Sequence, residues 1–102
     1  MFTIEDKEYE IEFSQKRIEI IENTLNRSVM EIFNNSSALM TIRELKTFTA
    51  YGLKQVGATA FVNPAQGMQI AEKLLDVNGY APLLEAVTGA IHRDCGFFFQ
   101  GA

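Results

Sequence analysis

The chain changes its hydrophobic period once, near Ser14, and this change limits the folds open to it. From Phe2 to Phe13 apolar residues alternate with polar ones, with an interruption at Asp6-Lys7, and glutamates fill the polar positions of the second half. Alternation with a period of two is typical of half-buried strands. We therefore predict a β-hairpin over residues 2–13. Because a lone hairpin is only marginally stable in water, one of its faces must pack on the rest of the chain.

Helix signals follow the hairpin, from about residue 15 to residue 95. N-cap residues and capping boxes mark the starts of helices, and apolar residues then recur at helical spacing. The predicted starts are Ser14, Ser28 with Glu31, Thr41 with Glu44, and Asn63 with Pro64. The expected fold class is therefore α+β and mostly α, with an N-terminal hairpin packed on a small bundle of four to five helices.

The same spacing predicts where the helices end. Asn26 is the expected end of the first helix, Asn34-Asn35-Ser36-Ser37 of the second, Val56 with Gly57 of the third and Asn78-Gly79 of the fourth. Glycine and asparagine tolerate the left-handed backbone conformation that commonly ends a helix. The last helix begins at Tyr80, and the chain should leave it near residues 94–96.

Composition narrows the possible functions. With 102 residues and 47% hydrophobic content, the chain suits one globular domain, placed at residues 1–96, followed by an aromatic tail at residues 97–102. A net charge of -4 argues against sequence-independent binding to nucleic acid, which needs a basic face. The start of the chain has no leader pattern, and no apolar run approaches membrane-spanning length. We expect a soluble cytoplasmic protein with neither nucleic-acid nor membrane partners.

Three consecutive phenylalanines, Phe97, Phe98 and Phe99, lie near the end of the chain. A short tail cannot bury all three rings, and an exposed aromatic cluster usually marks a surface for a partner. Ile20 and Tyr51 lie off the apolar stripes of their helices and could extend this surface. We therefore nominate these five residues as protein-binding.

Residues that could support catalysis are few. His92 and Cys95 are the only histidine and the only cysteine, so an internal disulfide or a zinc site of several Cys and His ligands is excluded within one chain. The two residues have the spacing of a facing pair on a helix, but a free cysteine usually packs as a small hydrophobic side chain. We expect a buried thiol beside a surface histidine, no cofactor, no metal and no enzymatic activity.

Several segments together resemble the tail assembly chaperones of long-tailed bacteriophages and prophages of Gram-positive bacteria. They are Ile4–Glu10 leading into Lys16–Glu19, then Thr47–Lys54, Gly67–Leu75 and Arg93–Phe98. The resemblance spans nearly the whole chain. Its motifs are short and carry no catalytic signature, so it rests on their order and on the size of the chain.

The resemblance implies a non-enzymatic assembly factor in the cytoplasm of the bacterial host, absent from the finished virion. Such proteins coat the tape measure protein, keep it soluble and help to recruit tail-tube subunits. The family often makes a longer product by ribosomal frameshifting, through which the tail-tube protein would be reached. Successive Phe codons are rich in uridine, so residues 97–99 could reflect a slippery RNA sequence as well as a binding segment.

The alternative function is a structural one. The chain could be a head–tail connector subunit of a phage, or another small interaction domain that associates with itself into a closed oligomer. A connector would remain in purified particles, whereas a chaperone would be missing from them. An enzyme ranks third.

Overall fold

A tight two-residue turn closes the hairpin at the start of the chain. Glu5 and Asp6 both have positive φ angles, 51° and 66°, which match the right-handed twist of the flanking strands. The turn sets the register, in which Phe2 lies opposite Tyr9. Tyr9, Ile11 and Phe13 are buried, as the alternating pattern predicts.

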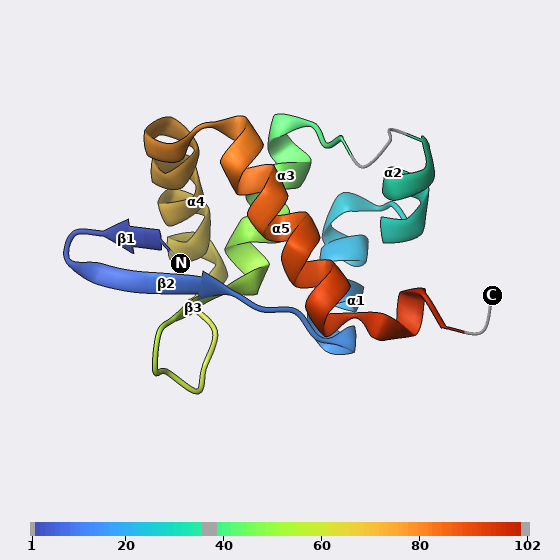
Figure 1. Ribbon diagram of the computed structural model, residues 1–102, viewed down its shortest axis with the longest axis horizontal. Coiled ribbons are helices and arrows are strands. Elements are labelled where there is room, and N and C mark those ends of the chain that lie inside the picture. Colours follow the sequence, from blue (N-terminus) through green and yellow to red (C-terminus); the bar gives the residue numbers. More distant parts are fainter. Residues whose placement is uncertain (1, 36–38, 101–102) are drawn as a thin grey trace.

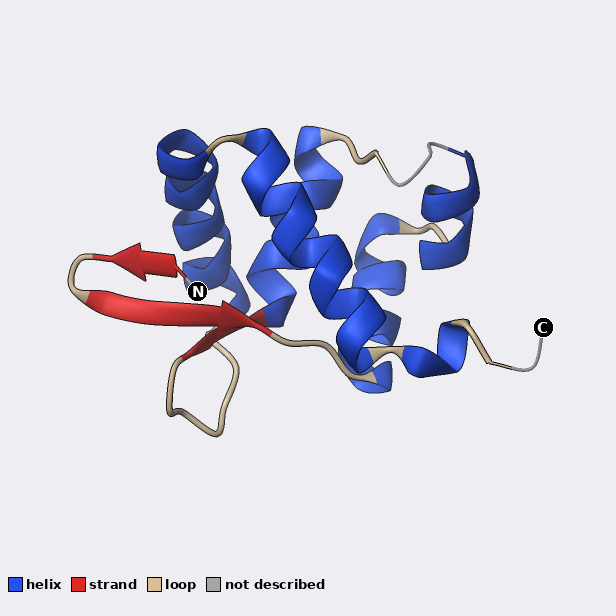
Figure 2. Cartoon of the chain, in the orientation of Figure 1, coloured by secondary structure: helices blue, strands red, loops and turns tan. Residues whose placement is uncertain are grey.

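The computed structural model describes residues 2–35 and 39–100. Its strands are β1 (Phe2–Ile4), β2 (Lys7–Ile11) and β3 (Leu53–Gln55), and its helices are α1 (Gln15–Leu25), α2 (Val29–Asn35), α3 (Ile42–Gly52), α4 (Pro64–Asn78) and α5 (Tyr80–Asp94), followed by the 3-10 turn η1 (Gly96–Phe98). The fold is α+β and mostly α, with a hairpin packed on a helical bundle, as predicted (Figure 2).

The sheet contains one strand that the sequence analysis placed in a helix. The third helix was predicted to continue to Val56 and Gly57, and this prediction is wrong. Helix α3 ends at Gly52, and β3 follows at once as the antiparallel partner of β2, giving the order β1-β2-β3. Leu53 is fully buried opposite Ile11, so pairing between distant segments outweighs the local helical spacing.

The predicted helix caps are confirmed by side-chain hydrogen bonds. The Ser14 hydroxyl accepts from the Arg17 N–H, Thr41 and Glu44 form the reciprocal capping box, and Asn63 caps α4 ahead of Pro64. At α2 only half of the predicted capping box is present. The Ser28 hydroxyl accepts from the Glu31 N–H, but the Glu31 carboxylate pairs with Arg27 instead of bonding back to the start of the helix. Helix α2 continues through Asn34 and Asn35, two residues of the predicted break, and Ser36 and Ser37 lie outside the described residues.

Helix α3 lies at the centre of the bundle and packs against α1, α4, α5 and β2 (Figure 1). Its buried Phe48 ring meets Phe13 edge to face, with ring centroids 6.1 Å apart. A Cβ atom added at Gly67 of α4 would lie 2.7 Å from the Ala50 carbonyl oxygen of α3. Glycine at this position therefore allows the backbones of α3 and α4 to approach closely.

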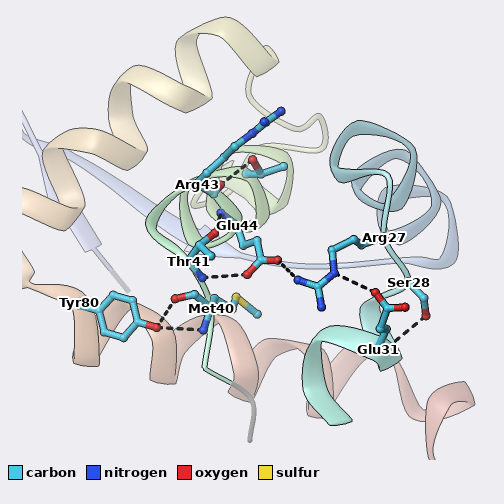
Figure 3. A network of polar contacts seen from close by, with 9 residues as sticks. Arg27, Ser28, Glu31, Met40, Thr41, Arg43, Glu44 and Tyr80 are labelled. Carbon is cyan, nitrogen blue, oxygen red and sulfur yellow. Dashed lines mark hydrogen bonds and ion pairs between the residues drawn. The ribbon is translucent and has the colours of Figure 1, made fainter. Parts of the chain in front are cut away.

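Polar contacts connect α3 to the neighbouring helices (Figure 3). Glu44 is buried, and its carboxylate accepts from Arg27 Nη1 at 2.7 Å while also capping α3 at Thr41. The Tyr80 hydroxyl of α5 accepts from the Met40 N–H at 3.0 Å and donates to the Met40 carbonyl oxygen. The start of α3 is thus bonded to both the α1–α2 connection and α5.

Two glycines on neighbouring helices give opposite predictions. Gly67→Ala should lower the free energy of unfolding by about 1 to 3 kcal/mol, because the added methyl group meets backbone of α3. Gly89→Ala, in the middle of α5, should raise it by roughly 0.5 to 1 kcal/mol, because among the described residues the new Cβ meets nothing within 4 Å apart from its chain neighbours and the backbone of its own helix. Urea unfolding of both variants measures the difference. Equal effects of the two changes would contradict the packing of α3 on α4.

Candidate protein-binding surface

The aromatic segment, Phe97–Phe99, is folded back by the turn that follows α5. The Cys95 N–H donates to the Ile91 carbonyl oxygen at 2.8 Å and continues the helix by one bond. The Phe98 N–H then donates to Cys95 at 3.0 Å, and the Phe99 N–H to Gly96 at 2.9 Å. These bonds give the three rings defined directions.

The turn separates the three rings into one inner and two outer ones. Phe98 is half-buried and packs against the hydrophobic core, whereas Phe97 and Phe99 are 39% and 44% exposed. The Phe97 ring lies against Phe98 with centroids 4.8 Å apart, and Phe99 stacks on His92 at 4.6 Å. The outward surface therefore consists of two rings supported from behind.

The other two nominated residues contribute less. Ile20 of α1 and Tyr51 of α3 are both half-buried, and Tyr51 packs against the core. Neither is as exposed as its position off the apolar stripe of its helix predicts. We therefore centre the candidate surface on Phe97 and Phe99.

An ionic anchor holds the end of α5 against the sheet. The Phe13 N–H donates to Asp94 Oδ2 at 3.0 Å, and Arg93 donates both to Asp94 and to the Ile11 carbonyl oxygen, at 2.6 Å for the latter. The bond from Arg93 lowers the pKa of Asp94, with a further lowering from the Phe13 N–H. The aromatic segment is therefore attached to a fixed helix end.

The thiol and the imidazole next to this segment do not form a nucleophile and base. Cys95 is fully buried, and burial, together with the charge of Asp94, raises its pKa to about 11. The thiol is therefore neutral at physiological pH. His92 is exposed and stacks on Phe99. The predicted arrangement, a buried thiol beside a surface histidine, is confirmed.

Further apolar side chains are exposed where the sequence analysis nominated none. Leu39 is 58% exposed, Ile42 52% and Val77 73%. Their residue types and spacing resemble those of core residues, and only the folded structure shows that they are exposed. No signal in the sequence could therefore have identified them. In the described part of the chain no three His, Cys, Asp or Glu side chains gather as a metal site requires, and no helix there could span a membrane.

Comparisons with protein-family models, with curated proteins and with solved structures each returned no match.

The anchor generates a prediction for Asp94. Asp94→Asn should lower the free energy of unfolding at pH 7 by about 1 to 2 kcal/mol, because a bond between a carboxylate and the Phe13 N–H is stronger than a neutral one. The folded pKa of Asp94 lies below its ordinary value of 3.8, so its contribution is full above that value and is lost as the pH falls below it. The difference between variant and wild type should therefore shrink in acid.

Urea unfolding at neutral and acidic pH measures this effect. Asp76→Asn is the matched control, because Asp76 is an exposed aspartate of α4 that no hydrogen bond or ion pair holds within the described residues. It should change stability by less than about 0.5 kcal/mol. If Asp94→Asn behaved like this control, the anchor would not contribute to stability.

Proposed function

We propose that this chain is a non-enzymatic tail assembly chaperone of a long-tailed phage or prophage, which binds the tape measure protein and keeps it soluble. The observation that supports the proposal most is the pair of exposed rings, Phe97 and Phe99, on an anchored helix end of an acidic chain. The resemblance described above supports the same function.

Physical reasons connect this surface with such a partner. A tape measure protein is long and largely helical, and its apolar helix faces would aggregate if left in water. Aromatic rings cover apolar surface effectively, and rings already held in place lose little freedom on binding. The net charge of -4 would keep the coated complex dispersed.

The wider assembly role is part of the same proposal. The chain would act in the cytoplasm of the host and leave before the virion is complete. A longer form made by frameshifting would recruit the tail-tube protein. The codons of residues 97–99 bear on this form, since an uninterrupted run of uridines followed by an overlapping frame would support slippage, whereas interrupted codons with no such frame would remove it.

Co-expression with the tape measure protein of the same phage tests the proposal. The intact chain should raise the soluble yield of that protein severalfold. Phe97→Ser with Phe99→Ser should abolish the gain, because both exposed rings are removed while the core-packed Phe98 remains. Leu39→Ser with Val77→Ser is the matched control, since it removes two other exposed apolar side chains, and it should retain the gain.

Two outcomes would contradict the proposal in different ways. If the tape measure protein stays insoluble with the intact chain, the chaperone function is wrong. If both double variants lose the gain equally, the tape measure protein is solubilised by exposed apolar side chains in general. The aromatic segment is then not the specific contact.

A further inference from the structure

One helical glycine, Gly89, makes no close packing contact that would explain it among the described residues. A Cβ atom at Gly52 would meet the Phe13 ring at 2.7 Å, and one at Gly67 would meet Ala50 of α3, so both glycines allow close internal packing. Gly89 lies in the middle of α5, where glycine weakens a helix, yet apart from its two chain neighbours and the backbone of α5 itself no described atom lies within 4 Å of its Cβ position. The space beside Gly89 is therefore open.

This space is part of a groove between β2 and α5, here called the β2–α5 groove. Its volume is about 400 Å³, close to the lower end of the range for binding pockets. Its apolar lining residues are Phe2, Ile11, Ala86 and Ala90. Gly89 also lines it and has no side chain that would fill it. Figure 1 shows the end of β2 running toward α5, and the two elements are in contact.

The unbalanced charges of the groove are negative. Glu10 of β2 and Glu85 of α5 both line it, and neither forms an ion pair within residues 2–35 and 39–100. Arg93 also lines it, but its guanidinium is bonded to Asp94 and to the Ile11 carbonyl oxygen. Its pKa is raised chiefly by Asp94, and only to a smaller extent by the charges of Glu12 and Glu10. The groove therefore favours a basic side chain.

The geometry favours a helix over a strand as the occupant. Strand β2 pairs with β3 from Tyr9 to Ile11 and with β1 from Lys7 to Tyr9. Beyond the end of β1 the Ile11 carbonyl oxygen already accepts from Arg93, so little of this edge remains for an added strand. The packing of α4 on α3 at Gly67 shows how this chain uses glycine to bring two helices close together. Gly89 offers the same close approach from outside.

We propose that the β2–α5 groove binds a helix of a partner protein, which packs its apolar face at Gly89 and places a lysine or arginine between Glu10 and Glu85. The groove contains no residue of the aromatic segment. The proposal is therefore independent of the chaperone function.

Two synthetic helical peptides of roughly 20 residues serve as probes. They share a stripe of leucine and alanine, and the flanking positions carry lysine in one peptide and glutamate in the other. Binding is measured by fluorescence anisotropy, and its location by the amide shifts of labelled full-length chain. Gly89→Leu places a large side chain in the groove, and Gly89→Ala, which adds only a methyl group, is its control. Glu85→Gln removes one carboxylate. Glu19→Gln is the matched charge control, because Glu19 is exposed on α1.

The lysine peptide should bind, shift the amides of Ala86, Gly89 and Ala90, and bind at least about tenfold more weakly to Gly89→Leu than to Gly89→Ala. Glu85→Gln should weaken binding about threefold to tenfold and Glu19→Gln less than about twofold. The glutamate peptide should not bind. The proposal is overturned if the lysine peptide fails to bind, if its shifts lie elsewhere, or if Glu85→Gln and Glu19→Gln weaken it equally. Glu85→Gln keeps the test valid should Gly89→Leu unfold.

Discussion

Phe13 is the point at which the sheet, the central helix and the last helix meet. Its ring packs edge to face on Phe48 of α3 and lies over Gly52, where a side chain would collide with it. Its N–H is held by Asp94 at the end of α5. One residue just after β2 therefore contacts the end of α3, where β3 begins, and the end of α5, from which the aromatic segment follows. Both candidate surfaces depend on this junction.

Features decided by neighbouring residues were predictable from the sequence. The hairpin, the Thr41–Glu44 capping box and the end of α4 at Gly79 all depend on contacts within a few residues. Strand β3 was not predictable, because Leu53 continues the helical spacing of α3 while its partner, Ile11, lies far away in the sequence. Tertiary pairing decided between two structures that the local pattern allowed equally well.

The candidate surface was predictable only in part. Composition indicates that Phe97–Phe99 cannot all be buried, but the turn after Cys95 decides that Phe98 faces the core while its neighbours face outward. Gly89 is a signal already present in the sequence, since glycine in the middle of a helix lowers its stability without an evident compensating contact. The structure shows the difference between the two helical glycines: a Cβ at Gly67 would collide with α3, whereas one at Gly89 would lie in open space.

We propose above all that the aromatic segment, held by the Asp94 anchor, contacts the tape measure protein. Hydrogen–deuterium exchange of the purified complex, compared with the chain alone, tests it most directly. The amides of residues 96–100 should exchange more slowly in the complex than in the chain alone, and those in the interior of α3 should be unchanged. Unchanged exchange at residues 96–100, with protection on another face of the molecule, would contradict it.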